Sequence, residues 1–287
     1  WKAALRSIDG LIKKDVNALH KVASVQIELY GSLAKTGRGH GTGLAIMLGL
    51  SGDDPVTIDV EKVRPKVANI RETKKLLLGG INEIQFNPAS QIIFSTNKAM
   101  PYHSNALRFS FTLTNGEIKE ELYYSVGGGF IVKEGEAPEV LKKKVRYQTT
   151  SAQELLMWCK EANGSIAEVV MENELLWRNK LEVKEKLLDI WAIMQDCVYR
   201  GCHLTGELPG GLQVNRRAAG IAGKLIPDKD YQNQTEWLTT IKKTDPSFSK
   251  ILKWVSCFAL AVNEENAAFG RVVTAPTNGA AGVTPAV

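Results

Sequence analysis

The residue pattern changes once along this chain, near residues 134–147. Before that point, short runs with apolar residues at alternate positions are interspersed with helical runs; after it, apolar residues recur at helical spacing. The segment between is rich in Lys and Glu and contains Pro138, which is typical of a linker. The 287 residues are enough for two domains. We therefore predict an α+β N-terminal domain with a largely antiparallel sheet (residues 1–147), followed by an all-α domain (residues 148–287).

The first half is expected to consist mainly of short strands. Val25, Ile27 and Leu29 alternate with polar residues and predict a half-buried strand over 25–29. Asn115-Gly116 predicts a hairpin of type I′, which needs a positive φ at both central residues. Further strands are expected over 56–60, 81–86, 91–95, 109–113, 120–125 and 130–132, and helices within 1–18 and over 44–48 and 64–78.

In the second half, capping residues indicate where helices begin. Ser151 with Glu154 and Ser165 with Glu168 have the spacing of capping boxes, and each predicts the start of a helix. Apolar residues at helical spacing over 175–198 predict two more helices, and Asp245-Pro246 predicts another start. The final residues, 272–287, hold two prolines and two glycines and are expected to form a loop.

A glycine-rich stretch, residues 30–42, contains the first candidate functional side chain. Gly37, Gly39 and Gly41 surround His40. Glycine is used where the chain turns tightly or approaches a ligand closely, and an imidazole is a candidate acid or base near neutral pH. A glycine-rich turn with a solvent-facing histidine is an equally good interpretation. The glycine spacing does not fit the dinucleotide-binding fingerprint, so a Rossmann site is disfavoured.

Four cysteines raise the question of a metal site. So few in a chain of this length argue against a disulfide scaffold and fit a reducing compartment. Cys197 and Cys202-His203 suggest metal binding, but no third or fourth thiolate follows nearby, and structural zinc and cluster sites need about four protein ligands. Cys159 and Cys257 lie on apolar helix faces and fit small core residues better. The sequence therefore predicts no metal ligand among these residues.

Two further stretches are candidates for ligand contact. His103 and Asn105 share a polar loop after a predicted strand, where a solvated loop is the simpler interpretation. Near the end, residues 263–268 precede a run of small residues over 270–282. Free backbone N–H groups in such a loop suit a carboxylate or a phosphate. A helix–helix connection packed through small residues is the alternative.

Charge and hydropathy exclude two classes of partner. The net charge is +5, and the one basic cluster, residues 142–146, has no interleaved aromatic residues, so nucleic-acid binding is not expected. No apolar run is long enough to span a membrane. Charged residues interrupt the first apolar residues of the chain, which is not typical of a signal peptide.

Three stretches taken together resemble the bacterial iron–sulfur L-serine dehydratases. They are residues 30–42, residues 125–131, and residues 261–268 continuing through Thr-Ala-Pro-Thr-Asn-Gly at 274–279. Their order and spacing match the family, and the resemblance extends from about residue 22 to residue 287. Leu208-Pro209-Gly210 also resembles a turn of that family.

The resemblance implies an activity and a set of site residues. These cytoplasmic lyases convert L-serine to pyruvate and ammonia without pyridoxal phosphate, in amino-acid catabolism and gluconeogenesis, and homodimers are expected. Their cofactor is a 4Fe–4S cluster with three cysteine ligands, whose open iron acts as a Lewis acid. By the match, His40 is the candidate base. His103 and Asn105 match a loop that lines the active site, and Thr277 and Asn278 match a loop that would hold substrate.

The chain also departs from the family's pattern. The family's cluster cysteines are expected beyond Val287, none of the four cysteines here matches them, and an N-terminal Ser-Ser-Ser-His-Thr segment is absent. The chain is therefore expected to be an internal piece whose catalytic helical domain is truncated, and to be inactive alone. The alternative is a non-catalytic module that binds serine and regulates.

Overall fold

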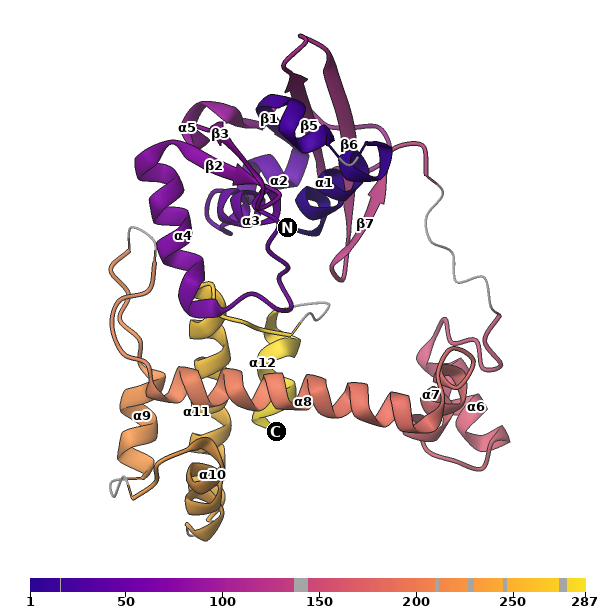
Figure 1. The fold of residues 1–287 in the computed structure, drawn as a ribbon. Helices are drawn as coiled ribbons and strands as arrows, with labels where there is room; N and C mark the ends of the chain where they lie inside the picture. Colours follow the sequence, from indigo (N-terminus) through magenta and orange to yellow (C-terminus); the bar gives the residue numbers. More distant parts are fainter. Residues whose placement is uncertain (16, 137–143, 210–211, 227–229, 245–246, 274–277) are drawn as a thin grey trace.

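The computed structural model of the chain describes residues 1–15, 17–136, 144–209, 212–226, 230–244, 247–273 and 278–287. A sheet with its covering helices makes up the first 136 residues, and the described residues from 152 onward form helices (Figure 1). This confirms the predicted fold class. The two halves meet where α4 (Val60–Thr73) approaches the end of α11 (Phe248–Ala267).

The main sheet has five strands in the order β4-β1-β5-β6-β7. Only the β1–β4 pair is parallel. Along β1 the apolar residues Val25, Ile27 and Leu29 are buried, as their alternation predicts. The strands are β1 Val22–Tyr30, β4 Ile92–Ser95, β5 Ala106–Leu113, β6 Ile118–Gly127 and β7 Phe130–Lys133; β2 Lys75–Leu78 and β3 Asn82–Gln85 form a separate antiparallel pair.

Helices cover this sheet and share one apolar core with it. The most hydrophobic is α3 Thr42–Leu50, whose residues 46–50 are all buried, which explains why its apolar side chains are not confined to one face. The core joins α3 to Phe109 and Phe111 of β5. The other elements are α1 Lys2–Lys14, η1 Ala18–Lys21, α2 Gly31–Thr36, α4 Val60–Thr73 and α5 Pro88–Gln91.

Two local predictions in this half are wrong. Residues 56–59 form no strand but a turn, in which the Asp54 carboxylate accepts the Val56 N–H, and Asp59 then caps α4. The helix expected over 64–78 ends at Thr73. Lys74 adopts a left-handed conformation (φ 55°), and residues 75–78 alternate exposed and buried as strand β2.

The hairpin between β5 and β6 is also not of the predicted type. Gly116 has a positive φ, but Asn115 is not among the residues with positive φ, so the turn is not I′. Instead, four residues connect the strands, and the Asn115 side chain accepts the Glu117 N–H. The asparagine works here through its side chain instead of through a left-handed backbone.

The helical half is built on two long helices, α8 Lys180–His203 and α11 Phe248–Ala267. They pack around a core that includes Trp237 and Trp254. In Figure 1, α6 and α7 lie at the far end of α8 from this core. The remaining helices are α6 Ala152–Glu161, α7 Ile166–Glu174, α9 Ala218–Leu225, α10 Gln234–Lys243 and α12 Asn278–Ala286.

The capping predictions hold at helix starts. Ser165 and Glu168 form a complete capping box. Ser151 accepts the Glu154 N–H, whereas the Glu154 carboxylate turns back to Thr150, so only half of that box forms. The Asp245-Pro246 start lies outside the described residues. The loop expected over 272–287 is wrong in part, because α12 occupies most of it.

Within the part of the chain that the structure describes, no helix combines the length and the apolar character needed to cross a bilayer.

We predict that residues 134–147 separate two independently compact pieces. Limited digestion with trypsin should cut first in this segment, which contains Lys142, Lys143 and Lys144, because a segment between domains offers its backbone to a protease more readily than packed helices do. A protease specific for glutamate should cut first at Glu134 or Glu136. First cuts within residues 169–198 by both enzymes would contradict the boundary.

Candidate functional site

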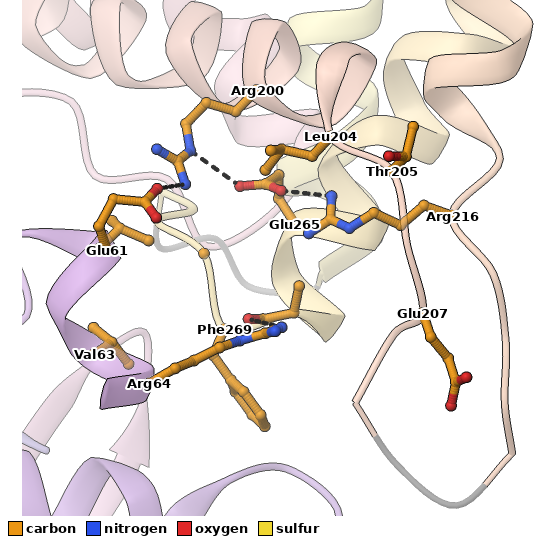
Figure 2. A pocket seen from close by; sticks show the side chains of 13 residues that line it. Glu61, Val63, Arg64, Arg200, Leu204, Thr205, Glu207, Arg216, Glu265 and Phe269 are labelled. Carbon is orange, nitrogen blue, oxygen red and sulfur yellow. Dashed lines mark hydrogen bonds and ion pairs between the residues drawn. The ribbon is translucent and has the colours of Figure 1, made fainter. Parts of the chain in front are cut away.

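The two halves are joined by contacts between α4 and the end of α11. Arg64 of α4 donates a hydrogen bond to the Ala268 carbonyl over 3.1 Å. Arg271, in the helical half, donates to the Ile58 carbonyl, which lies just before α4 in the sheet half. Figure 2 shows Arg64 reaching from α4 to this segment. Backbone carbonyls on both sides of the junction are thus satisfied by arginines from the other half.

The most buried charge at the junction is the carboxylate of Glu265, on α11. Glu265 is 1% exposed, and it accepts from Arg216 at 2.7 Å and from Arg200 at 3.4 Å. Arg200 also donates to Glu61 of α4 at 2.9 Å, so the ion pairs run from one half to the other (Figure 2). A buried charge is tolerated only when it is paired in this way.

The charge state of Arg200 follows from these partners. Burial works to lower the pKa of its guanidinium, but hydrogen bonds to Glu61 and Glu265 outweigh burial, and the pKa is raised. Arg200 therefore remains a cation that links the two halves.

The neighbouring carboxylate, Glu264, has a different task. It is 3% exposed and accepts the backbone N–H groups of Arg217 and Ala218, at 2.8 Å and 3.2 Å. These groups open α9, whose first residues have no side-chain cap of their own. A carboxylate at a helix N-terminus satisfies free N–H groups and interacts favourably with the helix dipole.

A polar cavity of about 230 Å³ lies over these ion pairs. Its walls come from α4, α8, the connection after α8 and the end of α11, and they include Arg64, Arg216 and Glu207 as well as the ion pairs (Figure 2). A cavity of this size has room for several waters or one small polar molecule.

His40 lies in the turn between α2 and α3 and is exposed. Its Nδ1 is 3.0 Å from the Thr36 carbonyl oxygen. A carbonyl can only accept, so Nδ1 carries the proton in the neutral ring and Nε2 keeps its lone pair. The imidazole is thus oriented with a proton acceptor at Nε2, which is the state that a general base requires.

His103 has the opposite arrangement. Its Nδ1 accepts the Asn105 N–H at 3.1 Å, so the neutral ring carries its proton on Nε2 and offers a donor. Asn105 Oδ1 is buried and has no hydrogen-bond partner among the described residues. A buried acceptor without a partner is costly, which makes it a candidate for ligand contact.

α2 fixes these two histidines relative to each other. A Cβ on Gly31, the first residue of α2, would lie 2.1 Å from the Ser104 carbonyl oxygen, so the 103–105 loop packs directly on the start of α2. His40 bonds to the last residue of the same helix. Six helical residues rise about 9 Å, so the helix holds the two side chains at its opposite ends without joining them.

The other two predicted site residues cannot be placed in the same way. Thr277 lies outside the described residues, as does the rest of the 274–277 segment, and Asn278 is the first residue of α12. Of the predicted anion-binding loop over 270–282, residues 270–273 form neither helix nor strand, residues 278–282 belong to α12, and the segment between lies outside the described residues.

The cysteines do not fit an iron–sulfur cluster. Cys197, Cys202 and Cys257 are buried in the helical core, and the Sγ atoms of Cys202 and Cys257 lie 3.9 Å apart. Cys257 also hydrogen-bonds the Ala218 carbonyl. Burial raises the pKa of Cys197 to about 12, whereas a cluster needs thiolates. No group of three His, Cys, Asp or Glu side chains in the described ranges is placed to hold a metal ion.

Sequence reasoning missed the ion pairs. It singled out residues 263–268 without assigning a role to Glu265, and it did not consider Glu61, Arg200 or Arg216. A usable signal was present, because two adjacent carboxylates in an apolar helix must find partners if that face is buried. The partners themselves lie 49 and 65 residues away along the chain, beyond the reach of local patterns.

Comparisons with known proteins match both halves. Residues 1–136 match the family described as serine dehydratase beta chain, and residues 161–287 match serine dehydratase alpha chain. The chain is 44% identical to an L-serine dehydratase of Streptomyces coelicolor over 94% of its own length and 57% of the relative's. It is 38% identical to L-serine dehydratase 1 of Escherichia coli over 100% of its own length and 60% of the relative's. The chain thus spans about three fifths of the length of these relatives.

The buried carboxylate yields a stability prediction. Glu265→Ala leaves Arg216 buried without its partner and should lower the free energy of unfolding by about 3–5 kcal/mol. Glu61→Ala removes a carboxylate whose side chain is 75% exposed and should cost less than about 1 kcal/mol. Urea unfolding of both variants measures the difference. Equal costs would show that Glu265 contributes no more than a surface charge.

The cysteine environments predict slow thiol chemistry. With an aromatic disulfide reagent at pH 8, only the partly exposed Cys159 should react promptly, because the three buried thiols are inaccessible to the reagent; all four should react in guanidinium chloride. Anaerobic incubation of the 287-residue chain with iron and sulfide should then give no cluster absorbance. Three fast thiols, or a reconstituted cluster, would contradict the assignment of these cysteines to the core.

Proposed function

Since the chain belongs to the family of bacterial L-serine dehydratases, we propose that the protein containing it converts L-serine to pyruvate and ammonia. The relatives are named for this activity. The observation within the chain that best supports the proposal is the pair of histidines at the two ends of α2. In the neutral rings, His40 carries its proton on Nδ1 and His103 carries its proton on Nε2.

His40 is the proposed general base. Its Nε2 carries a lone pair, and its place in an exposed turn leaves that atom accessible to a substrate. In the reaction, Nε2 takes the α-proton of serine. Proton transfer to a positioned side chain typically contributes on the order of 10²–10⁴-fold to the rate.

His103 and Asn105 are the proposed substrate-positioning pair. His103 offers an N–H at Nε2, which suits the carboxylate or the hydroxyl of serine. Asn105 Oδ1 offers an acceptor without a partner among the described residues, which suits the ammonium group. Contact of Thr277 and Asn278 with substrate remains a proposal that rests on the family resemblance alone.

The proposed chemistry is an elimination followed by hydrolysis. The Cα–H bond breaks, its proton goes to His40, and the electron pair forms the Cα–Cβ double bond as the β-hydroxyl leaves with a proton as water. The product, aminoacrylate, tautomerises to an imine. One water then adds to the imine and releases pyruvate and ammonia, so the water lost in the first stage is balanced by the water consumed in the second.

The 4Fe–4S cluster remains part of the proposal, with ligands other than the described cysteines. Because those cysteines do not fit a cluster, no step above is assigned to it. The expected position of the ligands, beyond Val287, stays a prediction, as do the homodimer and the cytoplasmic location. The alternative of a non-catalytic serine-binding module is not favoured by the comparisons, since the relatives are named as dehydratases.

The proposal predicts that His40→Asn nearly abolishes turnover in the protein that contains this chain. Asparagine keeps a hydrogen-bonding side chain but accepts no proton at neutral pH, so only an interaction of the transition state is lost. The decisive measurement is the exchange of the α-deuterium of labelled L-serine into solvent. Exchange at the wild-type rate in the variant would exclude His40 as the base.

His103→Asn is the matched control, because it makes the same substitution at the other end of α2. If His103 only positions substrate, this variant should raise KM more than it lowers kcat. Loss of deuterium exchange in the His103 variant, with exchange kept in the His40 variant, would reverse the two roles.

A further inference from the structure

Phe269 has an unusual backbone conformation for its type. It follows Ala268, the C-cap of α11, and has a φ of +62°, in the left-handed region. A bulky residue seldom adopts this conformation, and such strain persists only where the surrounding contacts over-determine it. Phe269 belongs to the helical half of the chain, yet its ring packs against the apolar core of the sheet half.

The ring ends on the backbone next to His40. A Cβ added to Gly41 would lie 2.3 Å from Cε1 of Phe269, so the ring fills the space that any side chain at residue 41 would take. Gly41 itself has a φ of +68°. Two left-handed residues from different halves therefore fit against each other, and one of them is the immediate neighbour of the proposed base.

Contacts on both sides of Phe269 hold it in place. Before it, the Ala268 carbonyl accepts from Arg64. After it, the Gly270 N–H donates to the Glu265 carbonyl at 2.8 Å, and a Cβ on Gly270 would lie 2.5 Å from Glu265 Oε2. The ion-paired carboxylate of Glu265 thus packs against Gly270, the residue next to Phe269.

We infer that Phe269 is a positioning residue for His40. The inference rests on the proposed role of His40 as the base. Residues 38–40 of this turn are exposed, and the bond from Nδ1 of His40 to the Thr36 carbonyl orients the ring only relative to α2. The ring of Phe269, packed against Gly41, supports the turn itself from the other half of the chain. A displacement of about 1 Å in a reacting group can cost on the order of 10²-fold in rate.

The first test is kinetic and uses Phe269→Leu in the complete, cluster-loaded protein. Leucine keeps an apolar side chain but is too short to replace the ring at Gly41. We expect kcat to fall at least 10-fold, with KM for L-serine changed less than 2-fold and with α-deuterium exchange slowed in the same proportion as kcat.

Phe258→Leu is the matched control. Phe258 lies on α11 and packs in the helical core away from Gly41, so the same substitution removes the same atoms without touching the turn. It should leave kcat within 2-fold of the wild type. Equal losses in the two variants would mean that Phe269 acts only through stability, which overturns the inference.

A second test separates this inference from the proposed function. Hydrogen exchange of the backbone amides of residues 38–42 should accelerate at least 10-fold in Phe269→Leu and stay unchanged in Phe258→Leu, whatever the role of His40. If His40→Asn abolishes turnover but Phe269→Leu changes neither exchange nor kcat, the inference is wrong while the proposed function stands. If His40→Asn keeps full turnover, both are overturned, even where the exchange result shows the contact.

Gly41→Ala tests whether Phe269 and the turn that contains His40 are coupled. A Cβ at residue 41 must displace either the ring or the turn, so this single variant should also lose kcat. In the double variant with Phe269→Leu the support is already absent, and the combined loss should be smaller than the product of the two single losses. A fully multiplicative loss would overturn the link between Phe269 and the turn.

Discussion

The carboxylate of Glu265 is the group on which the junction depends. It is almost completely removed from water, so it must be paired wherever the chain places it. Its partners, Arg200 and Arg216, lie on α8 and on the connection before α9, and Arg200 continues the ion pairs to Glu61 on α4. One buried charge thereby fixes three segments of the helical half and aligns them with the sheet half.

The segment that Glu265 holds in place also contacts the turn that contains His40. Two residues after α11 the chain adopts a left-handed conformation at Phe269, whose ring fills the space beside Gly41. The next residue, Gly270, donates its N–H back to the Glu265 carbonyl. The helical half thus supplies charge and support, whereas the sheet half supplies the two imidazoles. Because α2 spans the distance between those imidazoles, a short helix sets the separation of an acceptor at His40 and a donor at His103.

The sequence predicted those features that local physics determines. Alternation at Val25, Ile27 and Leu29 predicted β1, and Ser165 with Glu168 predicted the start of α7, because both signals lie within a few residues. The left-handed Lys74 ended a helix that the periodicity alone would have continued. Three features arise only from tertiary packing: the partners of Glu265, the contact of Phe269 with Gly41, and the buried Oδ1 of Asn105, which has no partner within the described part of the chain. The sequence therefore indicated the candidate histidines but not what holds them.

The central claim is that the chain presents one imidazole as a proton acceptor and the other as a donor, and ¹⁵N NMR of histidine ring nitrogens tests it most directly. Protonated and unprotonated ring nitrogens have well-separated shifts, and His40→Asn and His103→Asn assign the signals. At a pH where both rings are neutral, the account predicts a proton on Nδ1 of His40 and on Nε2 of His103. A proton on Nε2 of His40 would contradict it, because that atom then has no lone pair with which to take the α-proton of serine.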